Sequence, residues 1–125
     1  MSMARKEGIT LQLHVEGELE TTYSDLAAMA DRVGLDKRRL VRHYAPPTLT
    51  GSVTQGLTPS VLIGKGAIEE VLSTAESSTH GFLLETDYMD DVRRPGAVLG
   101  PKTVPKRTNQ LLEAGLDEEF LWKAH

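Results

Sequence analysis

Two histidines and one aspartate stand near the carboxyl ends of strand-like segments and have the chemistry to bind a divalent metal ion together. His14 lies toward the end of segment 9–16, and His43 and Asp87 end later apolar segments. The carboxyl ends of parallel strands meet at one edge of an α/β fold, where active sites are built. Two imidazoles and a carboxylate form a three-ligand zinc set that leaves a fourth position for water. Such an ion lowers the pKa of its water to about 7 and polarises a carbonyl or phosphoryl group of the substrate.

Two glutamates near these residues are candidates for a supporting role. Glu16 shares the strand face of His14, and Glu85 has the same strand parity as Asp87. A carboxylate at either position could orient a ligating histidine, or it could be an ordinary exposed residue at a strand end. The whole pattern also fits a structural role, in which both histidines make hydrogen bonds and Asp87 caps a turn.

Short strands that alternate with helices must position these residues. Apolar and polar residues alternate strictly over 9–16, which predicts a strand with two different faces. The apolar positions 26, 29, 30 and 33 lie on one face of a helix, whose predicted start is the capping-box-like sequence at 22–25 and whose natural end is Gly34. The other expected elements are strands at 40–44, 61–63 and 81–86, helices over 68–75, from Thr103 to about Gly115 and from Asp117 onward, and a loop at 48–60.

This order of elements predicts one α/β domain that comprises residues 1–125. Strands that alternate with helices favour parallel pairing through βαβ crossovers. A chain of 125 residues is the usual size of one domain. We expect residues 1–8 to form a flexible N-terminus ahead of the first strand.

The composition excludes several classes of protein. The absence of cysteine excludes a disulfide framework, a cysteine-ligated zinc site and thiol catalysis. The net charge of −4 gives no electrostatic case for general nucleic-acid binding or membrane-surface binding. No apolar run approaches the roughly 20 residues of a transmembrane helix, and the basic N-terminus lacks the apolar region of a signal peptide. We therefore expect a cytoplasmic protein that does not associate with membranes.

Residues 81–108 (GFLLETDYMDDVRRPGAVLGPKTVPKRT) resemble the end of an archaeal-type branch of the TatD-related metal-dependent hydrolases. Their Glu-Thr-Asp run is similar to the last barrel strand of that family, which ends in a metal-ligating Asp. The segments at 11–14 (LQLH), 40–44 (LVRHY) and 59–63 (PSVLI) resemble the fifth, sixth and seventh strands, and the first two of these strands carry ligating histidines. The resemblance implies an amidohydrolase-like TIM barrel that performs metal-assisted hydrolysis, including DNase activity in some members.

The same resemblance implies roles for individual residues. His14, His43 and Asp87 would be metal ligands, and Asp87 would also orient or deprotonate the attacking water. Zinc and manganese are the implied cofactors, and magnesium is a further candidate. Nucleic acid would enter as a phosphodiester substrate only.

The chain covers about half of such a barrel. A complete barrel needs roughly 250 residues, the sequence lacks the family's first-strand His-x-His pair, and only strands five to eight have counterparts. A half-barrel has two open edges and an uncovered inner face, to which Thr10, Gln12 and Val41 would contribute. We therefore expect self-association or pairing with a complementary N-terminal half-barrel chain. A non-catalytic association module and an inactive remnant are the alternatives to a working hydrolase.

Residues 22–45 allow a different interpretation as a helix-turn-helix DNA-binding module. A first helix, a turn at 33–36 and a basic helix over 37–45 have the spacing of that motif. The proline pair that follows would make the second helix short, and the net charge of the chain is negative.

Overall fold

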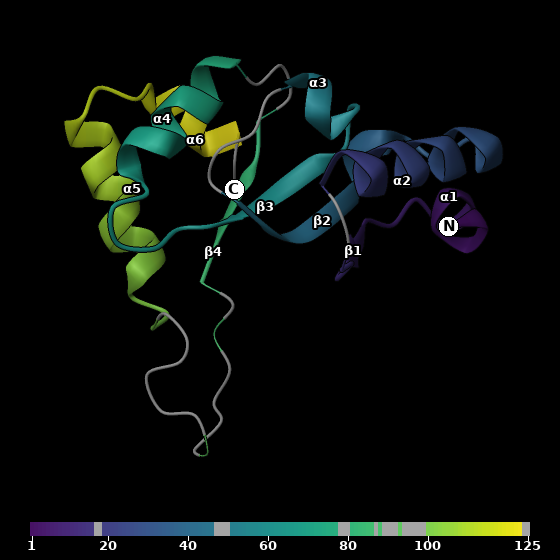
Figure 1. The fold of residues 1–125 in the computed structure, drawn as a ribbon, viewed down its shortest axis with the longest axis horizontal. Helices are drawn as coiled ribbons and strands as arrows, with labels where there is room; N and C mark the ends of the chain where they lie inside the picture. Colours follow the sequence, from purple (N-terminus) through teal and green to yellow (C-terminus); the bar gives the residue numbers. More distant parts are fainter. Residues whose placement is uncertain are drawn as a thin grey trace.

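The computed structural model describes residues 1–16, 19–46, 51–77, 81–86, 88, 93 and 100–123. Within these ranges, short strands alternate with helices (Figure 1). The strands are β1 (Leu11–Leu13), β2 (Leu40–Ala45), β3 (Thr58–Leu62) and β4 (Leu83–Glu85); the helices are α1 (Ser2–Glu7), α2 (Leu19–Val33), α3 (Gly51–Thr54), α4 (Ile68–Ser77), α5 (Thr103–Glu113) and α6 (Glu118–Lys123); and a 3₁₀ turn, η1 (Lys37–Arg39), precedes β2.

The four strands form a sheet in which every neighbouring pair is parallel. Their order follows the chain, β1-β2-β3-β4. This confirms the prediction of an α/β fold built from parallel βα units. Right-handed crossovers that always step in one direction place their connecting helices on the same face of the sheet. A doubly wound sheet instead reverses its strand order at a switch point, whereas the order seen here is that of consecutive strands in a (β/α)₈ barrel.

One face of the sheet packs against the helices and forms the hydrophobic core. Leu40, Val61 and Leu84 belong to this core together with Tyr23 of α2 and Val71 of α4. In Figure 1, α1 and α2 lie beside β1 and β2, while α4, α5 and α6 lie toward the β4 side. Each large apolar side chain buried in this way contributes about 1.5–3 kcal/mol. These contacts are therefore the main interaction that holds the helices on the sheet.

The opposite face, which we call the open face, lies outside the core. The strand register places seven side chains on it, and none of the seven belongs to the main hydrophobic cluster that the described residues form. Two of them are half-buried leucines. Gln12 is exposed on this face and Val41 is buried, and the expectation that they face a missing half-barrel stays a prediction. The seven residues are Gln12, Val41, Thr58, Ser60, Leu62, Leu83 and Glu85.

Helix α2 ends where the sequence predicts but begins earlier. Gly34 has a φ of +67°, and the N–H of Leu35 donates to the carbonyl of Ala30 at 2.9 Å, as in a Schellman motif. The predicted start at 22–25 is wrong, because these residues lie inside the helix. Tyr23 is fully buried there, so tertiary packing extends the helix past the local capping signal.

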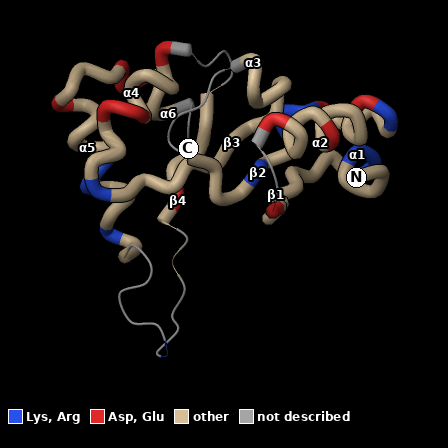
Figure 2. The backbone as a smooth tube through the Cα atoms, in the orientation of Figure 1, with Lys and Arg blue, Asp and Glu red and all other residues tan. Residues whose placement is uncertain are grey.

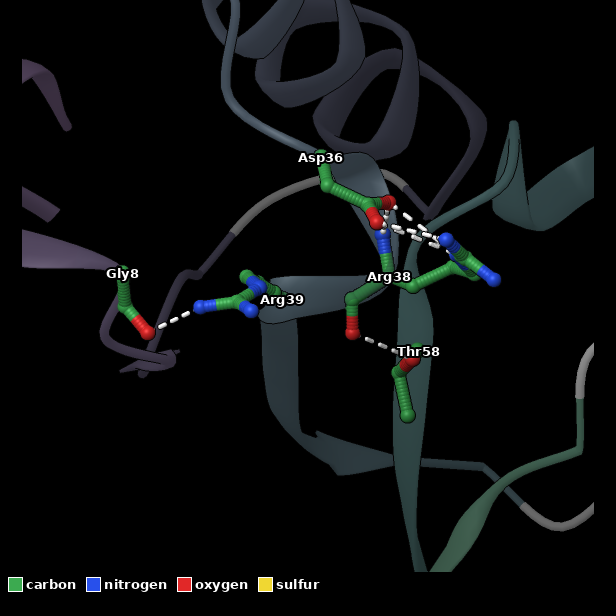
Figure 3. A network of polar contacts seen from close by, with 5 residues as sticks. All are labelled: Gly8, Asp36, Arg38, Arg39 and Thr58. Carbon is green, nitrogen blue, oxygen red and sulfur yellow. Dashed lines mark hydrogen bonds and ion pairs between the residues drawn. The ribbon is translucent and has the colours of Figure 1, made fainter. Parts of the chain in front are cut away.

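Residues 1–8 differ from the flexible segment that we expected, because residues 2–7 form helix α1. Ala4 is 1% exposed and belongs to the core. The carbonyl of Gly8, which follows the helix, accepts a hydrogen bond from the guanidinium of Arg39 (Figure 3). This contact links the end of α1 to the turn η1, which precedes β2.

The helix-turn-helix interpretation is wrong in its second helix. Residues 37–39 form a 3₁₀ turn and residues 40–45 form strand β2. Leu40 and Val41 pair with Leu11 and Gln12 of β1. The apolar residues of this segment thus complete a parallel sheet, and no recognition helix is present at this position.

A polar network fixes the turn between α2 and β2 (Figure 3). The carboxylate of Asp36 accepts hydrogen bonds from the backbone N–H of Arg38 at 3.0 Å and from its guanidinium at 2.7 Å. The carbonyl of Arg38 accepts a hydrogen bond from the hydroxyl of Thr58 at 2.8 Å, which ties the turn to β3. The hydrogen bonds from Arg38 lower the pKa of Asp36 to about 2.

Charged residues are concentrated on the helices and turns (Figure 2). Within the four strands, the charged residues are Arg42 of β2 and Glu85 of β4. In the described part of the chain, every helix is too short or too polar to cross a membrane.

Arg42 places its guanidinium on the covered face of the sheet. The residue is 7% exposed, and its guanidinium carbon lies 5.3 Å from the centroid of the Tyr23 ring. Its Nε and Nη1 atoms have no hydrogen-bond partner among the described residues. Burial raises the pKa of Tyr23, and the charge of Arg42 opposes that rise.

We expect the substitution Arg42→Met to stabilise the protein by about 1 kcal/mol. Unsatisfied buried donors cost about 1–3 kcal/mol, which outweighs the loss of a cation–π contact at its lower range of about 0.5 kcal/mol. Urea denaturation measures the change, with exposed Lys106→Met as a control that should shift stability by less than about 0.5 kcal/mol. A clear destabilisation by Arg42→Met would contradict this account.

We expect the substitution Asp36→Asn to destabilise the protein at pH 7 and to destabilise it much less at pH 2. The lowered pKa of Asp36 means that its ionised form is favoured in the folded state. The resulting stabilisation is complete above the unfolded pKa of about 3.9 and disappears as the pH falls through about 2. Urea denaturation of both proteins at each pH tests this, and an equal difference at the two pH values would contradict an ionic origin.

Candidate functional site

The polar side chains that could carry chemistry gather on the open face, toward the carboxyl ends of the strands. His14 follows the last residue of β1, His43 lies in the second half of β2, and Glu85 is the last residue of β4. The strand register puts Glu85 on the same face as Leu62 of β3. Three separate strands therefore contribute to one cluster.

The two histidine rings lie side by side within this cluster. Their centroids are 5.4 Å apart, with an angle of 48° between the ring planes. A tetrahedral zinc ion with nitrogens at about 2.0–2.1 Å places two ring centroids roughly 5 Å apart. His14 is exposed, whereas the side chain of His43 is 19% exposed. The spacing of the rings is therefore compatible with two ligands to one ion.

The carboxylate of Glu85 forms hydrogen bonds with residues of β2 and β3. Its Oε2 atom lies 2.8 Å from Nδ1 of His43 and also accepts a hydrogen bond from the hydroxyl of Ser60. Its Oε1 atom accepts a hydrogen bond from the backbone N–H of Tyr44 at 2.7 Å. Because a carboxylate can only accept hydrogen bonds, Nδ1 of His43 acts as the donor. In metal sites a carboxylate typically holds one ring nitrogen of a histidine in this way while the other binds the ion.

The end of β2 is distorted where it contributes to the cluster. The pairing of β2 with β3 changes register between Arg42 and Ala45, and Tyr44 has a φ of +59°. A left-handed conformation costs a residue such as tyrosine about 1–3 kcal/mol. The distortion accompanies the hydrogen bond from Tyr44 to Glu85 and leaves the Tyr44 ring exposed, 6.0 Å from the ring of His43 and 6.5 Å from that of His14.

The structure brings together three of the five residues that the sequence nominates. His14, His43 and Glu85 share the cluster. Glu16 is exposed beyond β1 and lines a separate hollow beside the start of α2. Asp87 lies outside the described residues, so its role as a ligand stays a prediction. The side chains of the described residues alone assemble no group of three or more potential metal ligands.

The sequence reasoning missed three members of the cluster. The amide nitrogen of Gln12 lies 3.3 Å from Nδ1 of His43. The strict alternation of β1 could have identified Gln12, since it lies two residues before His14 on the same strand face. The residue pattern predicts a loop that ends at Ser60, whereas the resemblance places Ser60 in a strand, as the structure does. The contact of Tyr44 is made by its backbone, which no residue pattern reveals.

The chain is similar in sequence to an archaeal protein of unknown role. MJ1127, an uncharacterized protein from Methanocaldococcus jannaschii, is 36% identical over 126 residues, which correspond to the whole of this chain and 43% of that protein. The chain therefore spans less than half the length of the curated relative that it matches. No protein-family model matches the chain. No solved structure matches it either.

We expect the substitution Glu85→Ala to destabilise the protein by about 1–3 kcal/mol, because it leaves buried donors without an acceptor. Glu85→Gln retains an acceptor oxygen and should cost less. Urea denaturation measures both changes, with exposed Glu113→Ala as the control at less than about 0.5 kcal/mol. If Glu85→Ala cost no more than Glu113→Ala, the carboxylate would not organise the cluster.

Proposed function

We propose that this chain is part of a cytoplasmic, divalent-metal-dependent hydrolase of the TatD-related type. The single observation that carries the proposal is the His14–His43 pair on the open face, with Glu85 bound to Nδ1 of His43. Both imidazoles stand near the carboxyl ends of neighbouring parallel strands, the position at which barrel enzymes carry their catalytic groups. The sequence resemblance of residues 81–108 adds Asp87 as the third ligand.

The donor set fits zinc or manganese, with magnesium as a further candidate that would favour more oxygen ligands. When bound, the ion would supply Lewis-acid activation of water and of a carbonyl or phosphoryl oxygen. Glu85 would hold His43 in one tautomer and one orientation. Asp87 would hold the attacking water and remove its proton. Phosphodiesters, including those of DNA, are the substrate class that the resemblance favours.

The parallel sheet also supports a second, non-catalytic role as an association module or an inactive remnant of a hydrolase. The observation in favour is the open face, which presents half-buried Leu62 and Leu83 outside the core. In this case the chain would bind a partner without binding metal. Metal content separates the two functions.

We expect the purified chain to contain close to one equivalent of zinc or manganese. Elemental mass spectrometry after gel filtration measures it in the wild type and in the triple variant His14→Ala/His43→Ala/Asp87→Ala, which should be metal-free. Glu85→Ala should weaken metal affinity about 10–100-fold, the usual effect of losing a carboxylate that supports a ligand.

The matched control is His125→Ala, which removes a histidine that we do not place in the site and should leave the metal content unchanged. If the triple variant binds as much metal as the wild type, the ligand assignment is wrong. If the wild type stays metal-free after incubation with excess ion, the non-catalytic role is favoured.

A further inference from the structure

Tyr44, beside the His14–His43 pair, combines a strained backbone with an exposed ring. Its φ of +59° lies in the left-handed region, which is unfavourable for a residue with a bulky side chain. The residue is 49% exposed and lies outside the hydrophobic core. Strained residues are concentrated at functional sites, where the surrounding structure holds them in place. The strain of Tyr44 therefore calls for a functional explanation.

The backbone contact of Tyr44 does not require a tyrosine. Its N–H donates to Oε1 of Glu85 at 2.7 Å, and every residue except proline has such a donor. Glycine would supply the same hydrogen bond without the cost of the left-handed conformation. The ring is thus the part of Tyr44 that the backbone contact leaves unexplained, and the hydrogen bond to Glu85 fixes the position from which the ring projects.

The ring of Tyr44 lies close to both imidazoles. Its centroid is 6.0 Å from that of His43 and 6.5 Å from that of His14, and its plane is inclined to their planes by 59° and 57°. Aromatic rings attract one another at centroid separations of about 4.5–7 Å. A flat group carried by a ligand at the histidine pair is therefore within reach of the Tyr44 ring.

We propose that Tyr44 is a specificity-determining residue, whose ring stacks on a flat aromatic group attached to the reacting ester. The inference rests on the proposed function, which places the reacting carbonyl or phosphoryl group at His14 and His43. A rigid ring on a fixed backbone loses little conformational freedom when a ligand binds. Because stacking uses the face of the ring, the phenolic hydroxyl is not needed. The site therefore prefers aryl esters to aliphatic esters of the same charge and similar size.

Two phosphate monoesters of equal charge and similar size test this preference. Phenyl phosphate carries a flat aromatic ring, and cyclohexyl phosphate carries a puckered aliphatic ring. Isothermal titration calorimetry measures their affinities for the purified chain, once with excess zinc and once with a chelator. Phenyl phosphate should bind about three- to tenfold more tightly, the range expected for an aromatic pair beyond its buried area. Zinc should strengthen the binding of both esters alike, because the ion would act on the phosphate that they share.

Two substitutions at position 44 separate the ring from the backbone. Tyr44→Phe retains the ring and should retain the preference. Tyr44→Asn removes the ring but keeps the N–H that binds Glu85, and asparagine tolerates the left-handed conformation, so this variant should lose the preference. The matched control Trp122→Asn removes a 73% exposed aromatic ring from α6 and should leave the ratio of the two affinities unchanged. If Tyr44 only supported the local structure, its loss would lower both affinities and leave their ratio unchanged.

Circular dichroism verifies that each variant folds. If Tyr44→Asn does not fold, a measurement on the wild-type chain replaces it. Nuclear Overhauser contacts between the phenyl protons of bound phenyl phosphate and the ring protons of Tyr44 are then the expected result, and their absence would contradict the proposal.

The role of Tyr44 and the metal site can fail separately. If zinc strengthens the binding of both esters and neither is preferred, the metal site stands and the role of Tyr44 is overturned. If the phenyl ester is preferred, Tyr44→Asn removes the preference and zinc has no effect, the ring contact stands and the metal site is contradicted. A preference that persists in Tyr44→Asn or disappears in Tyr44→Phe would overturn the proposal, as would a failure of both esters to bind.

Discussion

Parallel pairing of consecutive strands is the constraint on which the rest of this structure depends. Every crossover from one strand to the next must return the chain to the same end of the sheet, and right-handed crossovers in one direction keep the helices on one face. Tyr23 of α2 and Val71 of α4 share the core with the covered face of the sheet for this reason. The same constraint brings all four carboxyl ends to one edge. The position of the polar cluster is thus a consequence of topology before it is a consequence of residue type.

Glu85 organises that edge because a carboxylate with little exposure must find donors. Its side chain is 12% exposed, and it accepts hydrogen bonds from His43, from the backbone of Tyr44 and from Ser60. These donors come from β2 and β3, so one side chain of β4 connects the ends of three strands. The register change and the left-handed conformation at the end of β2 are local costs that accompany this arrangement.

The sequence predicted the parts of the fold whose signals are local. The alternation around His14, the glycine that ends α2 and a helix that begins after Asp117 are all seen in the structure. The Asp117 side chain accepts a hydrogen bond from the N–H of Glu119 at the start of that helix. Strand β1 is nevertheless shorter than the alternating segment 9–16, since only residues 11–13 have a neighbouring strand to pair with.

Other features could not be predicted because they depend on tertiary contacts. Helix α1 is fixed by the burial of one alanine, and the early start of α2 by the burial of Tyr23. The same limit applies to the site. Strand parity indicated Glu85 as a candidate. Its contact with His43, however, joins residues 42 positions apart in the chain, and the pattern of a single sequence carries no information about that contact.

The location of the cluster on the open face links the stability of the fold to the electrostatic interactions within the site. His14, His43 and Glu85 stand on the open face, so any layer that covers Leu62 and Leu83 also removes water from around the two imidazoles. Removing water strengthens every electrostatic interaction in a site, which raises the energetic value of the Glu85–His43 contact. Anything that binds the folded sheet and not the unfolded chain also stabilises the fold by mass action. Any ligand that covered the open face of the described sheet would therefore act on the stability of the fold and on the site together.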